Sequence, residues 1–313
     1  MGFISMIKKK QNQRRLFKGV HYVLPVNSDE IDRTHQQHYV YREIWKKDFS
    51  APVEDLLIKG ARVLDIGCGP GTWTLELGTK YSNSKFKGID AYRWYPTTIK
   101  PTNVSFDQAN VLDGLPYEDD EFEYVIMRFM MFSFLLKEWK PIIKEMIRVC
   151  KPNGWIEIME DDLVFLEGGP KTEMLIKTIT KELKKKGVET IITPYIFTLL
   201  NSNSEITNVT SKKKVSQLGS LGNKQGELFL DSLKWGAKSL FESERLFKND
   251  RNGILTIYNE IIDDFVNECN EHPTYFVSRR FYARKTLRVE NTTTWRKFFR
   301  IKRFLKGIQG HRR

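Results

Sequence analysis

A single stretch decides the fold of this chain: Val63-Leu64-Asp65-Ile66-Gly67-Cys68-Gly69-Pro70-Gly71-Thr72-Trp73. The apolar residues 61–66 predict a buried strand, the glycines within 67–71 predict a tight turn, and a helix should begin at Thr72. Glycines let a backbone approach a ligand where a Cβ atom would collide, and a helix N-terminus offers unpaired N–H groups. This order of elements is typical of a nucleotide-type site at the edge of a parallel sheet.

The spacing of the glycines separates two classes of cofactor. The dinucleotide fingerprint G-x-G-x-x-G, begun at Gly67, requires a third glycine at position 72, where this chain has Thr72. The second strand is expected to end at Asp90, which lies 21 residues after Gly69. A carboxylate there either caps a turn or accepts both ribose hydroxyls, as in NAD and S-adenosylmethionine sites. Thr72 therefore disfavours a nicotinamide-dependent oxidoreductase, whereas Asp90 suits either cofactor.

Strands and helices alternate after the glycine turn, which indicates a parallel, doubly wound sheet. The expected strands are 61–66, 86–89, 104–108, 122–127 and 155–159, with helices at 72–81 and 139–149. Beyond residue 160 we expect helices at 171–185 and about 190–200, a strand at 206–215, a helical stretch at 227–269 and a last strand at 275–283. Upstream, Asn27 or Ser28 can cap a helix at 29–47, which is expected to cover the ligand site.

Polar residues at the ends of later strands are further candidates. Asn110 can bond the exocyclic amine of an adenine through its side-chain oxygen, and the N–H of Val111 can meet a ring nitrogen. Arg128, after the fourth strand, either points at a substrate or pairs with an acid. The acids 160–162, after the fifth strand, lie at the edge where substrates bind and form either a cation-attracting rim or a proton acceptor, or else a solvated loop. No base constellation stands out, so Arg128 and Glu160 are the only candidates for a catalytic role.

Composition bounds the class of protein. The chain has 313 residues and a net charge of +12, but residues 279–313 hold 13 Lys/Arg and residues 1–18 hold six, so the middle is mildly acidic. The three cysteines are far apart in the sequence and form no C-x-x-C motif, which argues against a disulfide framework and against a metal site. We therefore expect a reducing compartment, the cytoplasm. Cys68 is expected to pack rather than act as a nucleophile. No apolar run reaches the roughly 18 residues of a membrane span.

The two ends of the chain differ from the body. Residues 1–20 form a basic lead that is expected to be disordered. The tail, 287–313, interleaves aromatic and basic residues, as do segments that bind a membrane surface, an acidic partner or a nucleic acid. Packing of its aromatic side chains back onto the body is an equal alternative. A basic tail is also compatible with a nuclear address.

Several short motifs occur in one order and together resemble the fungal LaeA-like (UMTA-type) family of class I S-adenosylmethionine-dependent methyltransferases. They are Tyr22-Val23-Leu24-Pro25 with Asp29-Glu30, the 63–73 stretch, Gly88-Ile89-Asp90, Leu115-Pro116-Tyr117, Asp119-Asp120-Glu121-Phe122-Glu123, Arg128-Phe129 and Lys151-Pro152-Asn153-Gly154-Trp155-Ile156-Glu157. The likeness extends to Lys224-Gln225-Gly226-Glu227-Leu228 and Tyr282-Ala283-Arg284-Lys285, and so covers about residues 20–286. The glycines at 67, 69 and 71 after Asp65 correspond to motif I of these enzymes.

The resemblance implies a Rossmann-like class I methyltransferase fold: a mostly parallel seven-stranded sheet, helices on both faces and a helical insert before the last strand. It implies a domain over 21–286, comprising a covering helix at 29–47, a cofactor-binding core at 55–160 and a C-terminal part at 161–286. It also implies S-adenosylmethionine contacts at Asp65, Gly67, Gly69, Gly71, Asp90, Asn110 and Val111, to which we add Arg128. The departures are Asn110, where relatives often have Asp, the residues Ala91-Tyr92, and the basic tail.

Two hypotheses of function follow. The first is transfer of a methyl group from S-adenosylmethionine to an unidentified small molecule or protein. The second is a methyltransferase-like regulatory or assembly protein without essential catalysis, anchored by its tail. Motifs that would specify an arginine or amino-group acceptor are missing, so the acceptor atom stays open.

Overall fold

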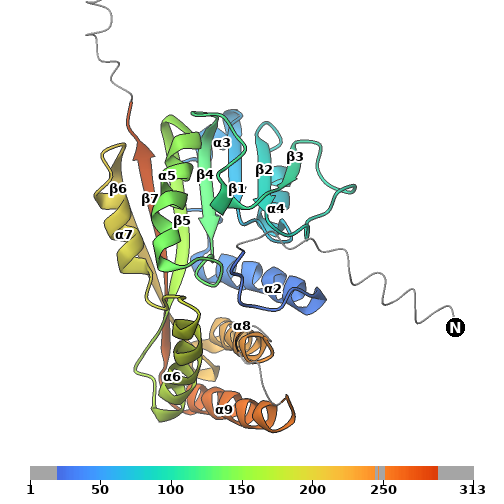
Figure 1. Cartoon of the computed structure of the whole chain (residues 1–313), viewed down its shortest axis with the longest axis vertical. Coiled ribbons are helices and arrows are strands. Elements are labelled where there is room, and N and C mark those ends of the chain that lie inside the picture. Colours follow the sequence, from blue (N-terminus) through green and yellow to red (C-terminus); the bar gives the residue numbers. More distant parts are fainter. Residues whose placement is uncertain (1–19, 244–245, 247–250, 288–313) are drawn as a thin grey trace, which may run out of the picture.

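The computed structural model describes residues 20–243, 246 and 251–287, so the basic lead up to residue 19 and the tail from 288 onward lie outside the described residues. Figure 1 shows one sheet flanked by helices, with a layer of helices below the carboxyl ends of its parallel strands. The strands are β1 Arg62–Ile66, β2 Lys85–Asp90, β3 Val104–Gln108, β4 Phe122–Arg128, β5 Cys150–Leu166, β6 Ile206–Gln217 and β7 Tyr275–Lys285. The helices are α2 Ser28–Trp45, α3 Glu54–Lys59, α4 Thr72–Lys80, α5 Trp139–Val149, α6 Pro170–Lys185, α7 Thr193–Asn201, α8 Asn223–Phe241 and α9 Arg251–Glu271.

The sheet confirms the predicted fold class. Its strand order is β3-β2-β1-β4-β5-β7-β6. The strands β1 to β5 pair in parallel, whereas β7 is antiparallel to both β5 and β6. The insert predicted before the last strand consists of α8 and α9. This is the Rossmann-like sheet of class I methyltransferases, and its order reverses at β1, where ligands bind in open α/β folds.

Alternating side chains of the central strands divide the core between two faces. Val63 and Tyr124 pack with α3 and α4 on one face. Leu64 and Val125 pack with α5 and α7 on the other face. Because successive side chains of a strand point to opposite faces, strands that carry apolar side chains on both faces require helices on both sides.

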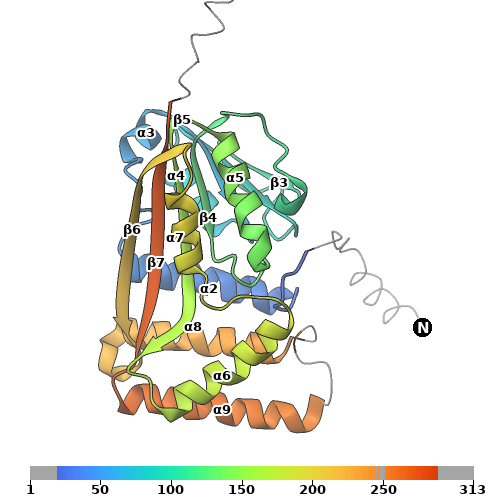
Figure 2. The ribbon, with the colours of Figure 1, turned by 60° about the vertical axis from the view of Figure 1, so that its left-hand side comes forward.

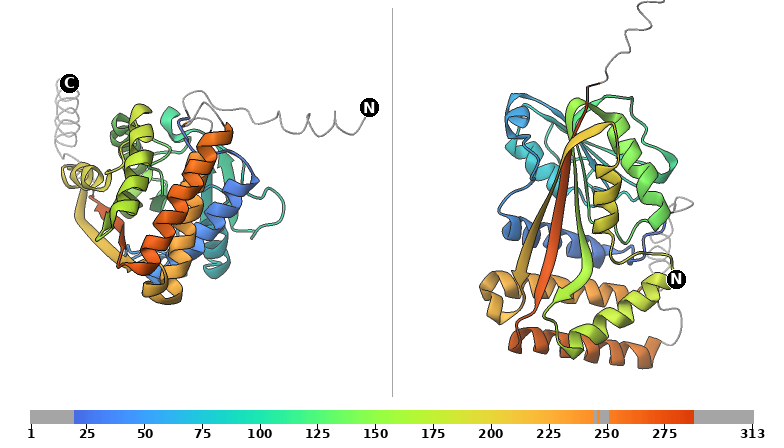
Figure 3. Two further views of the ribbon diagram at one scale, coloured as in Figure 1. Left: turned by 90° about the horizontal axis from the view of Figure 1, so that it is seen from below. Right: turned by 90° about the vertical axis from the view of Figure 1, so that its left-hand side faces the viewer.

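The fifth strand differs from its prediction. The sequence predicts a strand that ends at residue 159, but β5 continues to Leu166 and pairs with β7 as far as Tyr275. Figures 2 and 3 show β5, β6 and β7 extending beyond the rest of the sheet to the layer of α6, α8 and α9. The acids 160–162 therefore belong to a paired strand, and their interpretation as a solvated loop is wrong.

The helix α2 corresponds to the helix expected at 29–47. Asn27 caps it by accepting a hydrogen bond from the N–H of Glu30 at 2.9 Å. The helix lies between the carboxyl ends of the strands and α8, with which it is in contact. Its buried residues include Glu30, Arg33 and His38, which the apolar pattern does not predict. Within the described ranges, no helix combines the length and apolar character needed to cross a bilayer.

Candidate functional site

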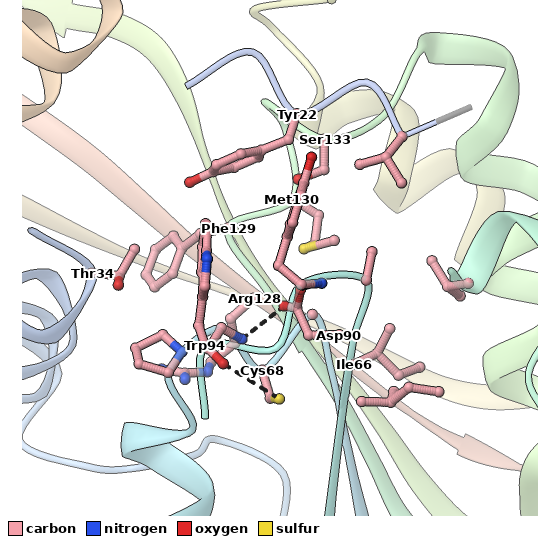
Figure 4. A pocket seen from close by; sticks show the side chains of 18 of the residues that line it. Tyr22, Thr34, Ile66, Cys68, Asp90, Trp94, Arg128, Phe129, Met130 and Ser133 are labelled. Atoms are coloured by element: carbon pink, nitrogen blue, oxygen red, sulfur yellow. Dashed lines mark hydrogen bonds between the residues drawn. The ribbon is translucent and has the colours of Figure 1, made fainter. Parts of the chain in front are cut away.

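A pocket opens where the chain leaves β1, β2 and β4, under the cover of α2. It encloses about 1020 Å³ of empty space, its mouth included. Figure 4 shows Tyr22, Asp90, Trp94 and Arg128 among the side chains that line it. Of the predicted cofactor residues, those that line the pocket are Gly67, Gly69, Asp90, Asn110, Val111 and Arg128.

The three glycines of the turn share one kind of backbone conformation, but Gly69 and Gly71 serve different purposes. All have positive φ, at 67° for Gly67, 55° for Gly69 and 78° for Gly71, a conformation that disfavours other residues. A Cβ atom at Gly69 would meet nothing within 4 Å among the described residues. At Gly71 it would lie 2.6 Å from the ring of Phe106. Gly69 therefore exposes backbone to a ligand, whereas Gly71 permits close packing behind the pocket wall.

Asp90 faces the glycine turn from the end of β2. Its carboxylate accepts hydrogen bonds from the N–H of Gly69 at 2.8 Å and the N–H of Tyr92 at 2.8 Å. Removal of the carboxylate from water raises the pKa of Asp90 from 3.8 to about 6. Each carboxylate oxygen has further lone pairs, so the group can still accept from a diol.

Asp65 lies behind the pocket. Its side chain is buried and accepts a hydrogen bond from Thr74 Oγ1 at 2.7 Å. Neither Asp65 nor Gly71 is among the described residues that line the pocket. Asp65 thus holds the start of α4 against β1. It would act on a ligand indirectly, by fixing the position of the glycine turn.

Arg128 and His38 form a polar floor that the sequence does not reveal as a pair. His38 Nε2 lies 2.7 Å from Glu76 Oε2, and His38 Nδ1 lies 3.4 Å from Arg128 Nη1. Burial and the charge of Arg128 lower the pKa of His38 to about 3. A neutral ring that donates from Nε2 and accepts at Nδ1 satisfies both contacts. Arg128 Nε is buried and has no hydrogen-bond partner among the described residues.

The end of β3 limits what the side chain of Asn110 can offer to a ligand. Asn110 Oδ1 accepts from the N–H of Leu112 at 3.1 Å and so caps the short 3-10 helix Val111–Asp113. The buried Nδ2 has no partner in the part of the chain that the structure describes. The group left free for a ligand is therefore a donor, and the oxygen has only its second lone pair to offer.

An aromatic cluster, Tyr22, Tyr92 and Trp94, borders the pocket. The rings of Tyr92 and Trp94 stack at 5.3 Å, and Tyr22 meets Trp94 edge-on at 5.8 Å. Such rings offer flat apolar surface to a nucleobase. Tyr92 and Trp94 lie in the loop after Asp90, and only their proximity in sequence to that acid could have identified them.

The two remaining candidates are Glu160 and Cys68. Glu160 accepts hydrogen bonds from the N–H of Met130 at 2.6 Å and of Met131 at 3.1 Å, and it lines a second cavity rather than this pocket. Cys68 lines the pocket, but burial raises the pKa of its thiol well above the usual range. That shift agrees with a packing role and opposes a thiolate nucleophile.

The sheet order and the position of the glycine turn are those of the class I methyltransferase fold. Residues 63–154 match the family model described as a methyltransferase domain.

Curated relatives carry mixed names. The chain is similar to the secondary metabolism regulator laeA of Coprinopsis cinerea, with 27% identity covering 50% of this chain and 40% of that protein. It is similar to the methyltransferase pytC of Aspergillus terreus, with 30% identity covering 53% and 51%. It is also similar to the demethylmenaquinone methyltransferase of Staphylococcus aureus, with 30% identity covering 45% and 59%. The chain thus spans about half the length of the curated relatives it matches.

Proposed function

We propose that this protein transfers the methyl group of S-adenosylmethionine to an acceptor. The observation that carries the proposal is Asp90, a carboxylate that reaches across to the N–H of Gly69 at the mouth of the glycine turn. Ribose hydroxyls can donate to Asp90, and the exposed backbone at Gly69 leaves room for the amino-acid part of the donor. Isothermal titration with S-adenosylhomocysteine tests the proposal, and absence of heat from folded protein would contradict it.

Methyl transfer needs little chemistry from the protein beyond alignment. A lone pair of the acceptor attacks the methyl carbon, the carbon–sulfur bond breaks, and its electron pair neutralises the sulfonium to leave S-adenosylhomocysteine. The proton of the acceptor leaves to solvent or to a nearby carboxylate. We assign Arg128 to the carboxylate of the donor, because its buried Nε lacks a partner among the described residues and a methionine carboxylate can supply one. Glu160 is assigned a structural role, because it holds the backbone of Met130 and Met131 after β4.

The pH dependence of donor binding follows from Asp90. Its pKa in the folded protein is about 6, so the ionised form prevails above that pH and the protonated form below it. Ribose hydroxyls donate to the ionised form, so affinity for S-adenosylhomocysteine should become constant about one pH unit above this pKa. It should fall as pH is lowered through 6, by up to tenfold per pH unit. Titrations between pH 5 and 8 measure this, and Asp90→Asn should remove the slope.

Asn110 allows a test of the orientation of the adenine. In Asn110→Asp one oxygen keeps the N–H of Leu112 and the other can accept from the exocyclic amine. We expect S-adenosylhomocysteine to bind roughly 5-fold more tightly to this variant, as for one hydrogen bond of about 1 kcal/mol. S-inosylhomocysteine, which carries a carbonyl in place of the amine, should bind more weakly to the variant. An unchanged ratio of the two dissociation constants would place the adenine elsewhere.

A second candidate function is a regulatory or assembly role of the LaeA-like type. The similarity to a protein named as a secondary metabolism regulator supports it, as do the motifs that the chain shares with that family. In this proposal the protein resides in the cytoplasm or nucleus, 21–286 forms the domain, and the tail 287–313 binds an acidic partner, membrane surface or nucleic acid. Cofactor-site variants would then keep the biological effect, and deletion of the tail would abolish it.

A further inference from the structure

A second cavity lies beside the donor pocket, between α2, the end of β5 and the helices α6 and α8. It encloses about 870 Å³ of empty space, its mouth included. Its walls are mainly apolar, and among them are Leu163, Leu175, Ile179, Leu233, Leu240 and Phe265. The helical insert, α8 and α9, supplies part of this surface, and the ends of β5 and β7 supply another part. The cavity therefore depends on the continuation of β5 and β7 past the rest of the sheet.

The two cavities share a wall. Tyr22, Arg33, Gln37 and Phe129 line both of them. Arg33 adds no net charge to this wall, because its guanidinium donates to the carboxylate of Glu30 at 2.7 Å and 2.8 Å. A molecule in the second cavity therefore lies next to the space that the donor would occupy.

Among the described residues, one polar atom at this cavity lacks a hydrogen-bond partner. Asp161 is 7% exposed and lines the cavity. Tyr41 donates its hydroxyl to Asp161 Oδ2, but Asp161 Oδ1 is buried without a hydrogen-bond partner among the described residues. The neighbouring Glu160 is already used by the backbone of residues 130 and 131. A buried oxygen without a partner costs free energy, which a ligand with a matching group would recover.

Gly236 keeps part of the cavity empty. It lies inside α8, where glycine disfavours the helix by about 1 kcal/mol relative to alanine. A Cβ atom at Gly236 would meet nothing within 4 Å in the described part of the chain. Packing with the described neighbours therefore does not require a glycine here. A glycine does, however, leave open the cavity space that a larger side chain would occupy.

From these features we infer that the second cavity binds the methyl acceptor, and that this acceptor is a small, uncharged, mainly apolar molecule whose hydroxyl hydrogen-bonds to Asp161. The inference rests on the proposed methyltransferase function. Burial raises the pKa of Asp161 to about 8, so the cavity is close to neutral at pH 7 and does not favour a cation. A hydroxyl can donate to the ionised carboxylate or accept from the protonated one, so it fits both forms.

The test uses the full chain saturated with S-adenosylhomocysteine, and 2-naphthol as the probe. We expect 2-naphthol to bind at least tenfold more tightly than naphthalene, which has the same rings without the hydroxyl. Gly236→Leu should weaken 2-naphthol binding at least tenfold because the new side chain fills the cavity. Gly236→Ala, the matched control, adds a single methyl group and should change it less than threefold. Fluorescence titration measures each dissociation constant.

The affinity for S-adenosylhomocysteine separates the two proposals. Gly236→Leu should leave it within twofold, which also shows that the variant folds. If that ligand binds but 2-naphthol does not, or binds Gly236→Leu as well as the unchanged chain, the acceptor inference is overturned and the donor site stands. If S-adenosylhomocysteine itself does not bind the unchanged chain, the proposed function fails first. Asp161→Ala should reduce the preference for 2-naphthol over naphthalene to less than threefold, and a retained preference would contradict the assignment of Asp161.

Discussion

Asp90→Ala should weaken binding of S-adenosylhomocysteine by about 1–3 kcal/mol, which is roughly 5- to 150-fold in the dissociation constant. The variant loses the acceptor of the ribose hydroxyls. It also releases the N–H of Gly69, whose bond of 2.8 Å to Asp90 holds the turn toward the end of β2. Isothermal titration at pH 7.5, above the pKa of about 6, measures the effect when Asp90 is ionised.

A neighbouring carboxylate provides the control. Asp113 is exposed and does not line the pocket, so Asp113→Ala should leave the affinity within about twofold. The contrast removes general effects of charge from the comparison, because both substitutions delete one acid. Equal affinities of the Asp90→Ala variant and the unchanged chain would remove Asp90 from the donor site.

The sequence predicts those parts of the site that depend on local pattern. A strand, a turn with three positive φ values and a helix leave a signature within 61–73, and an acid at the end of the next strand has a fixed place in such a fold. For this reason the sequence alone identifies Gly69, Asp90 and Asn110 as candidates, and the fold brings all three to one pocket.

The parts that depend on distant pairing could not be predicted. β5 runs to Leu166 because β7, more than a hundred residues later, pairs with it. The sequence around Asp161 contains three adjacent acids, which by local pattern indicate a loop. The contact between His38 and Arg128 likewise joins residues 90 positions apart, and neither position shows a periodic signal. Pairing across the fold, rather than local propensity, buries these groups.

The orientation of Asn110 does not follow from the sequence, for another reason. An amide has an acceptor and a donor end, and the residue type does not say which end faces the ligand. The N–H of Leu112, two residues later, donates a hydrogen bond to the side-chain oxygen and so fixes the orientation of the Asn110 amide. Backbone groups at the start of a short helix compete for side-chain acceptors, and that competition depends on the local turn.

Arg128 leads to the second large effect, because its guanidinium lies in the pocket floor with a buried Nε that has no partner among the described residues. Burial lowers the pKa of Arg128, and the negative charge of Asp65 opposes that shift. The side chain also lies over the ring of Trp73, with 5.5 Å between the guanidinium carbon and the ring centroid. A cation in this setting gains most from a bound anion, and the donor carries one carboxylate.

Arg128→Met should therefore weaken S-adenosylhomocysteine binding by about 2–5 kcal/mol, as for the loss of one partner of a buried charge pair. Methylthioadenosine has the same base, ribose and sulfur but no carboxylate, so its affinity should change less than threefold. Arg42→Met is the matched control, since Arg42 pairs with Glu76 at 2.7 Å and does not line the pocket. If Arg128→Met weakened both ligands equally, Arg128 would support the pocket wall rather than bind the donor carboxylate, because methylthioadenosine lacks the whole amino-acid part and has no anion for Arg128 to bind.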